Sequence, residues 1–241
     1  MIKIVNVLHL SDLHYTKVDA SKAFELSQVK KALIKDLGTY CVEDRTPDLI
    51  IVSGDLVARA SEKDIHTHVF DDFLDAICKA ARCGEERLVL VPGNHDADRS
   101  IVEKREVELT ELKSKQHDSH TLNSVFFDDR IAHHVSDVFA GFLELKEMIG
   151  DSTGDGISFV RNFPEIGVDV ISLNTAWATW AGYKNRSDHG NLSVPEAAFC
   201  KSIESCDASF KILATHHPLS WLRDYRSTME HVPHSIFWCF E

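Results

Sequence analysis

Four short motifs carry side chains that bind metal ions or move protons. They read Ser11-Asp12-Leu13-His14, Ser53-Gly54-Asp55, Gly93-Asn94-His95-Asp96 and Thr215-His216-His217-Pro218. Carboxylate, amide and imidazole ligands without thiolate suit Mn, Fe or Zn. The carboxylate of Asp55 can bridge two cations, because each of its oxygens carries free lone pairs. The motifs therefore predict a site for divalent cations.

Each motif follows a run of apolar residues with strand character. These runs cover residues 2–10, 48–53, 88–91 and 210–215, and helical patterns occupy residues 21–37 and 62–81. Strands that alternate with helices favour a parallel sheet covered on both faces. Ligands of such sheets bind at the carboxyl ends of the strands, so we expect the four motifs to meet there.

Residues 97–150 have a different pattern, which is charged, helical and free of proline. We expect them to form a helical insertion that overhangs the site, within a single domain spanning residues 1–241. Strand character returns at residues 157–160 and 168–173. The sequence Ser193-Val-Pro-Glu196 is a capping box with proline in the first turn, which predicts the start of a helix.

In this order the motifs resemble the calcineurin-like metallophosphoesterase family, whose signature is D-x-H, G-D, G-N-H-[DE], a later His and G-H-x-H. The resemblance covers nearly the whole chain. It implies an α/β fold, a layered α-β-β-α sandwich of two mixed sheets. It also implies two divalent metal ions (Mn, Fe or Zn) and hydrolysis of a phosphodiester or small phosphomonoester, nucleotides included, by a metal-bridging hydroxide.

The resemblance also implies the ligand sets of the two metals. Asp12, His14 and Asp55 would bind one metal, and Asp55, Asn94 and His216 the second. The neighbouring His217 competes with His216 for this role, and the resemblance favours the first of the two.

His95 would lie beside the phosphate, where it stabilises charge and protonates the leaving oxygen. An imidazole suits this task because its pKa lies near neutrality. Asp96 would orient His95 or a metal-bound imidazole from behind. The alternative is that Asp96 only caps a turn, and the residues leave both interpretations open.

The sequence departs from the family pattern in two places. Ala58 replaces the Asp of the G-D-x-V-D-R-G motif of protein phosphatases, which argues against a phosphoserine phosphatase. Arg59 is expected to be an exposed residue at a helix start, and the alternative is that it contacts a phosphate. No G-H-x-H occurs, and His231 and His234 are spaced wrongly to replace it. We therefore expect the C-terminal part of the domain to be missing. The alternative function is a non-catalytic binding or regulatory module, or an inactive truncated fragment.

Composition narrows the possible partners and compartment. The 241 residues carry 26 basic and 38 acidic side chains, a net charge of −12, so nucleic acid is not favoured as a partner. No apolar run is long enough to span a membrane, and the six cysteines contain no C-x-x-C pair. These features predict reduced thiols in a cytoplasmic protein. The remaining histidines, including His66, His133 and His134, are expected at the surface.

Overall fold

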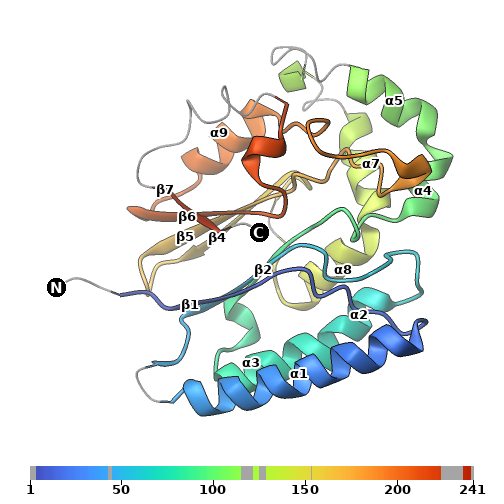
Figure 1. The fold of residues 1–241 in the computed structure, drawn as a ribbon. Coiled ribbons are helices and arrows are strands. Elements are labelled where there is room, and N and C mark those ends of the chain that lie inside the picture. Colours follow the sequence, from blue (N-terminus) through green and yellow to red (C-terminus); the bar gives the residue numbers. More distant parts are fainter. Residues whose placement is uncertain are drawn as a thin grey trace.

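The computed structural model describes residues 4–42, 45–114, 122–124, 129–152, 154–223 and 236–239. Its strands form two sheets (Figure 1). The first contains β1 (Val7–Leu10), β2 (Leu49–Ser53) and β3 (Leu88–Val91), which are parallel and lie in that order. The second contains β4 (Ser158–Phe163), β5 (Val168–Leu173), β6 (Phe210–Thr215) and β7 (Ile236–Cys239), again in chain order. This sheet is mixed, because β4 and β5 are antiparallel whereas the other pairs are parallel.

Helices cover the outer faces of both sheets (Figure 1). The first sheet is covered by α1 (Ala20–Tyr40), α2 (Ile65–Val69) and α3 (Asp75–Ala81), and the second by α9 (Glu196–Glu204). The segment between β3 and β4 is helical in its described part, with α4 (Arg99–Lys104), α5 (Glu106–Ser114), α7 (Asp129–Val138) and α8 (Ala140–Met148). Short 3₁₀ turns lie at Glu85–Arg87, Tyr183–Asn185 and Leu219–Trp221.

The core between the two sheets is built from alternate residues of their strands. Leu49 and Ile51 of β2 pack in one apolar cluster with Val168 and Val170 of β5. The residues between them, such as Ile50, belong to the larger cluster that includes the helices. This period of two follows from the pleat of a strand. The order of layers is therefore helix, sheet, sheet, helix, as the resemblance implies. Of the two sheets expected to be mixed, the second is mixed, whereas the described strands of the first are all parallel.

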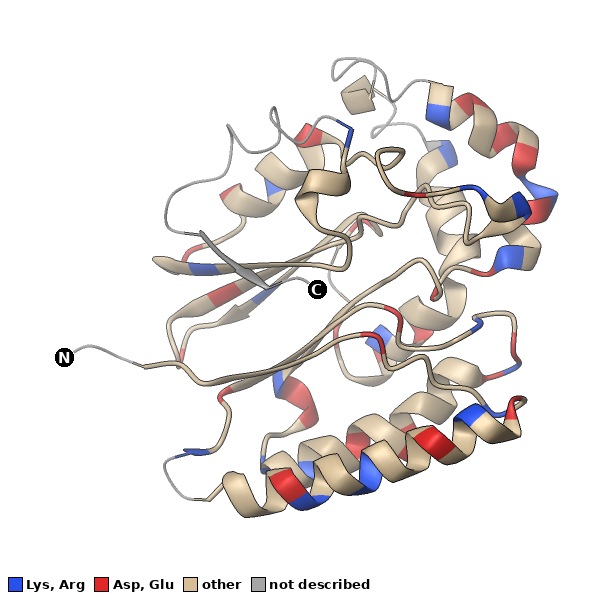
Figure 2. Cartoon of the chain, viewed as in Figure 1, with Lys and Arg blue, Asp and Glu red and all other residues tan. Residues whose placement is uncertain are grey.

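The strands that precede the four motifs end at one edge of the molecule. Parallel pairing of β1, β2 and β3 aligns their carboxyl ends, and β6 runs parallel to β5 in the facing sheet. Figure 2 shows that the three strands of the first sheet carry no charged residues and that acidic residues follow their ends. Apolar strands thus hold a group of carboxylates at the rim of the core.

Several local expectations are wrong. The helical pattern of residues 62–81 is interrupted by a π-helical segment, Phe70–Leu74, between α2 and α3. Ser193 does not cap α9, which begins at Glu196 without a side-chain cap. Because the backbone of Pro195 starts this helix, Ser193 lies too early in the chain, and its side chain is buried instead.

Two histidines expected at the surface are buried. His134 of α7 and His66 of α2 are 0 % and 4 % exposed. Each lies on the inner side of a helix, a placement that the charged residues around it in the sequence do not reveal. The neighbouring His133 is exposed, as expected. Among the described residues, no helix combines the length and apolar character that crossing a bilayer requires.

Candidate metal centre

The loops after β1 and β2 are held side by side by backbone hydrogen bonds. The N–H of Asp12 donates to the carbonyl oxygen of Gly54 over 3.2 Å, and the N–H of His14 donates to that of Asp55 over 2.9 Å. Asp12, His14 and Asp55 all have left-handed backbones, with φ of 55°, 45° and 51°. Such conformations cost energy in residues other than glycine and are concentrated at functional sites. The two parallel strands therefore continue into a strained pair of loops that presents three ligand side chains.

Asp55 is the centre of the cluster. Its Oδ2 lies 3.6 Å from Nε2 of His14 and 3.9 Å from Nε2 of His95. Its other oxygen, Oδ1, lies 3.5 Å from Nε2 of His216. The ligand atoms of His14, Asp55 and His95 form one group that can hold a cation, and those of Asp12, Asp55 and His216 form another. Asp55 is common to both groups, one oxygen on each side, which is the arrangement of a bridging ligand.

These groups differ in part from the ligand sets given by the resemblance. His95 joins His14 and Asp55, although the sequence assigns it to acid catalysis. Asp12 joins the group of His216, but its Oδ1 also lies 3.4 Å from Nε2 of His14. Asn94 lies beside this second group, because its Oδ1 is 3.3 Å from Nε2 of His216. The structure thus brings all six predicted side chains together around Asp55.

The ring of His216 is oriented for metal binding. Its Nδ1–H donates to the backbone oxygen of Ser53 over 2.9 Å, so Nε2 presents a lone pair. That nitrogen faces Oδ1 of Asn94 at 3.3 Å and Oδ1 of Asp55 at 3.5 Å. The lone pair of Nε2 in the neutral ring and these two oxygen atoms can all bind one cation placed among them. The residues present therefore fit a divalent metal ion.

His217 faces away from this cluster. Its Nδ1 lies 2.9 Å from Oγ1 of Thr175, and its ring packs against Trp221. Burial lowers the pKa of His217 to about 3, with the adjacent His216 acting in the same direction. The structure therefore places His216, and not His217, among the candidate ligands. His231 and His234 lie outside the described residues.

His95 is fixed by a backbone group. Its Nδ1–H donates to the carbonyl oxygen of Ala58 over 2.9 Å, and its ring meets that of His14 edge-on with centroids 4.7 Å apart. Its side chain is 45 % exposed, whereas those of Asp55 and His216 are 5 % and 4 % exposed. Ala58 is the residue that replaces an Asp of the protein phosphatases. Its carbonyl oxygen orients His95 in place of a carboxylate, which sequence reasoning could not foresee.

Close packing of the backbone surrounds the carboxylate of Asp55. The N–H of His95 donates to its Oδ1 over 2.9 Å. A Cβ atom added to Gly93 would lie 2.2 Å from the same oxygen, and one added to Gly54 would lie 2.5 Å from the ring of His216. Burial raises the pKa of Asp55, and Asp96 adds to this effect, whereas His216 and His95 oppose it. A buried carboxylate of this kind is stabilised by a bound cation.

Asp96 connects the loops from beneath. Its carboxylate accepts from the N–H of Gly93 over 2.8 Å and from those of Leu56 and Val57 over 3.3 Å. Its Oδ1 also lies 3.4 Å from Nε2 of the buried His66, a neighbour that sequence reasoning missed. These contacts correspond to the turn-capping alternative. They tie the loop of Asp55 to the loop of His95 through the backbone.

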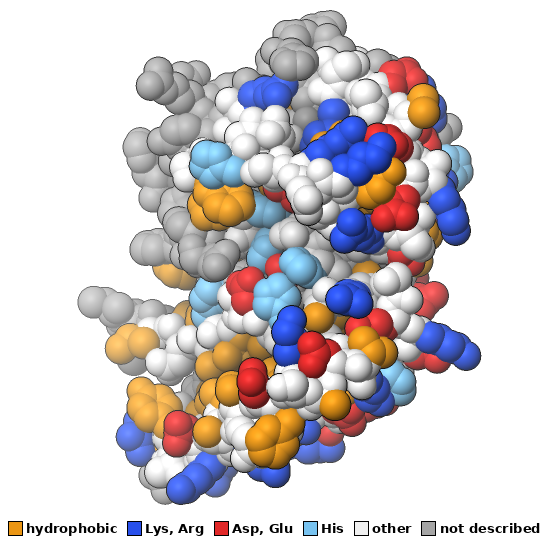
Figure 3. All heavy atoms as spheres, turned by 45° about the vertical axis from the view of Figure 1, so that its right-hand side comes forward, with side chains coloured by type: hydrophobic (Ala, Val, Ile, Leu, Met, Phe, Trp, Pro, Cys, Tyr) orange, Lys and Arg blue, Asp and Glu red, His pale blue; other side chains and the backbone are white. Residues whose placement is uncertain are grey.

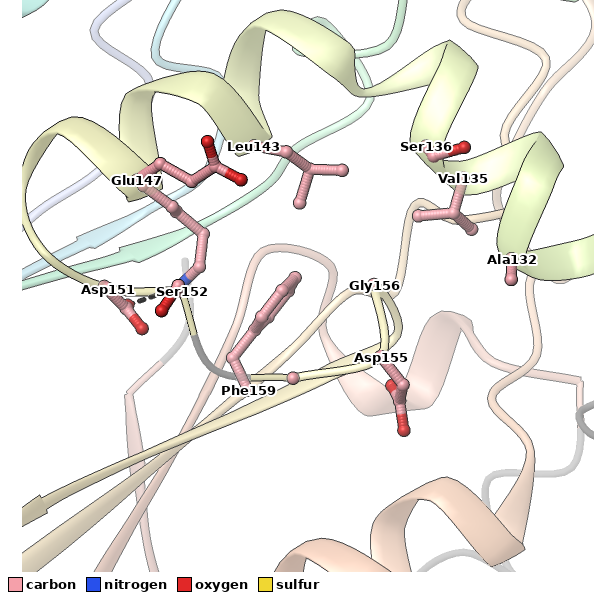
Figure 4. Close-up of a pocket in the computed structure, with 12 residues that line it drawn as sticks. Ala132, Val135, Ser136, Leu143, Glu147, Asp151, Ser152, Asp155, Gly156 and Phe159 are labelled. Atoms are coloured by element: carbon pink, nitrogen blue, oxygen red, sulfur yellow. Dashed lines mark hydrogen bonds and ion pairs between the residues drawn. The ribbon is translucent and has the colours of Figure 1, made fainter.

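A separate cavity of about 340 Å³ lies between α7, α8 and the segment before β4 (Figure 4). It contains none of the predicted site residues. Its wall includes the buried ion pair of Lys146 with Asp151, and Nζ of Lys146 lies 4.2 Å from the ring centroid of Phe159. The one cation in its lining is therefore already paired with a carboxylate.

Residues 5–235 match the family model described as calcineurin-like phosphoesterase. This match supports metal-dependent phosphoester hydrolysis in general. No curated protein matches the chain.

Proposed function

Because the chain belongs to the calcineurin-like phosphoesterase family, we propose that it hydrolyses a phosphodiester or a small phosphomonoester with the help of two divalent cations. One observation carries this proposal. The carboxylate of Asp55 has a group of candidate ligands at each of its two oxygens, and the exposed, backbone-oriented His95 lies beside them. The arrangement suits a phosphate held between two cations and an acid.

The candidate ligands divide between a buried and an exposed side. His216, Asn94 and Asp12 would hold one cation with Asp55, and His14 would hold the other. Mn, Fe and Zn suit this mixture of imidazole, carboxylate and amide ligands. When bound, the cations would neutralise phosphate charge and lower the pKa of water. His14 is 40 % exposed, so water and substrate can reach the site from its side.

His95 acts as the acid in this proposal. The hydrogen bond from its Nδ1–H to Ala58 directs Nε2 toward the site. Water oxygen forms a bond to phosphorus and releases one proton to the solvent. The bond from phosphorus to the leaving oxygen breaks, that oxygen takes the proton from Nε2 of His95, and His95 regains a proton from the solvent.

We also propose that the protein acts in the cytoplasm. Five cysteines in the described part of the chain have free thiols, namely Cys41, Cys78, Cys83, Cys200 and Cys206. Free thiols are typical of reducing compartments, and this supports action in the cytoplasm.

The test compares His95→Ala with His14→Ala. Turnover of bis(p-nitrophenyl) phosphate and metal content by mass spectrometry are measured after loading with Mn. We expect H95A to lower kcat by about 10²–10⁴-fold with unchanged metal content, and H14A to lose metal and activity together. His133→Ala, an exposed histidine on α7, is the control.

Two results would contradict the proposal. Loss of metal from H95A in proportion to activity would make His95 a ligand rather than the acid. A wild-type protein that binds two metals and hydrolyses neither phosphodiesters nor phosphomonoesters would favour the non-catalytic binding module.

A further inference from the structure

We propose that a cavity beside His95 binds an anionic leaving group. The substrate would then be a phosphodiester whose leaving alcohol carries a second phosphate or a carboxylate. This inference rests on the proposed function and names the substrate class of the same site.

The cavity has a volume of about 280 Å³ and adjoins the candidate metal centre. Its wall comes from the loop after β2, the loop between β3 and α4, and one residue of the segment after β5. The lining residues are Ala58, Arg59, Ala60, Ser61, Asn94, His95, Ala97, Arg99 and Ala181. A group bound there touches both the proposed acid and a candidate metal ligand.

The charge of the cavity is opposite to that of the whole chain. Two of its nine lining residues are arginines and none is Asp or Glu, although the chain has a net charge of −12. By contrast, the cavity of Figure 4 is lined by Glu147, Asp151 and Asp155, with Lys146 as its only cation. An anion is therefore attracted to the cavity beside His95 and repelled from the other one.

Both arginines have donors available for an anion. The side chain of Arg59 is exposed, and the described residues provide no ion-pair partner for it. Arg99 is 53 % exposed and contacts Glu103 through Nε at 3.4 Å, which leaves its terminal nitrogens to donate elsewhere. A guanidinium binds phosphate or carboxylate through two parallel hydrogen bonds. Together the two arginines can neutralise a doubly charged phosphate.

The position of His95 indicates which part of the substrate enters the cavity. His95 belongs to the group of Asp55 and also lines the cavity with the two arginines, so the metal centre and the cavity share this residue. The acid protonates the leaving oxygen, and the rest of the leaving group therefore extends into the space beyond it. Figure 3 shows histidine side chains gathered in a hollow on this face, with Lys and Arg side chains beside them.

The test uses two dinucleotides as probes. TpT and TpTp contain the same phosphodiester, but cleavage at the 5′-oxygen of TpTp releases thymidine 3′-phosphate, a leaving group with a second phosphate. We expect wild-type protein to prefer TpTp over TpT by about tenfold in kcat/KM, as one or two charge-assisted hydrogen bonds provide. Chromatography of the products identifies the bond that breaks.

Arg59→Ala and Arg99→Ala should each reduce this preference to about twofold or less. Arg99→Lys should retain part of it. The matched control is Lys79→Ala, because Lys79 also forms an exposed i,i+4 ion pair, with Asp75, and lines a different cavity. Calorimetry of thymidine 3′-phosphate binding to metal-free protein provides a readout that does not depend on turnover.

Hydrolysis of both dinucleotides without preference, or a preference that survives in both arginine variants, would overturn the inference. Absence of thymidine 3′-phosphate binding to wild type, or equal binding to all variants, would also overturn it. If the phosphate binds in an arginine-dependent way but no phosphoester is hydrolysed, the anion pocket is supported and the proposed function fails.

Discussion

Asp55→Asn should stabilise the metal-free protein while abolishing its response to metal. The substitution removes the negative charge of a side chain that is 5 % exposed and keeps its size. The backbone of Asp55 is left-handed, with φ of 51°, and Asn adopts this conformation as readily as Asp. Asp64→Asn is the matched control, because Asp64 has φ of 53° and a side chain that is 63 % exposed.

The magnitude follows from the burial of Asp55. Burial raises its pKa, and the imidazoles of His216 and His95 offset part of the cost of keeping it ionised. A buried ion costs several kcal/mol, so we take roughly 2 kcal/mol as the net cost after this offset. For a protein of this size each kcal/mol shifts Tm by about 2–4 °C. In EDTA, D55N should therefore melt about 4–8 °C above wild type. The control D64N should melt close to wild type.

Metal binding should reverse this order, so that wild type melts above D55N. Mn at about 100 times its Kd stabilises wild type by about 2.7 kcal/mol, or about 5–11 °C. D55N should gain little because both ligand groups have lost their common carboxylate. Differential scanning calorimetry measures the Tm of wild type and of D55N, each in EDTA and in Mn. A lower Tm of D55N than of wild type in EDTA, or an equal gain of both proteins in Mn, would refute the reasoning.

Further substitutions test the packing at the site and elsewhere in the fold. Gly93→Ala should weaken Mn binding at least about tenfold by calorimetry, because its Cβ would lie 2.2 Å from Oδ1 of Asp55. Gly38→Ala, with open space around it in α1, should instead stabilise the protein by about 0.5–1 kcal/mol. Asp96→Ala should cost about 3 kcal/mol or more in urea denaturation, because it leaves three backbone N–H groups without their acceptor. Burial lowers the pKa of His134 to about 4, so its neutral form is favoured in the fold, and stability should fall as pH drops from about 6.5 to 4. His134→Leu should remove up to roughly 3 kcal/mol of this loss, whereas the same change at the exposed His133 should leave the pH dependence of urea denaturation unaltered; equal slopes for both variants would contradict this assignment.

The apolar pattern of the sequence predicts the buried strands well because it reports burial directly, whereas the order of the layers came from the family resemblance. Runs such as Leu88–Val91 are apolar at every position, as a strand covered on both faces must be. Local signals were less reliable where packing overrides them. Phe24 and Val29 have helical spacing in α1 but are 66 % and 59 % exposed, and the capping box at Ser193 does not cap α9.

The sequence by itself determined which ligand types exist and at which end of the sheet they meet. Asp12, His14, Asp55, His95 and their partners follow strand ends, and parallel strands end at the same edge. The match to the calcineurin-like phosphoesterase family agrees with the order of these motifs.

Only the tertiary structure decided how these side chains are held. The choice of His216 over His217 depends on Ser53 and Thr175, which lie far away in the chain. The orientation of His95 depends on the backbone oxygen of Ala58, a group that every residue type possesses. Because a carbonyl oxygen leaves no signature in a sequence, and because burial of a polar side chain depends on elements packed from elsewhere, these features emerge only when the chain is folded.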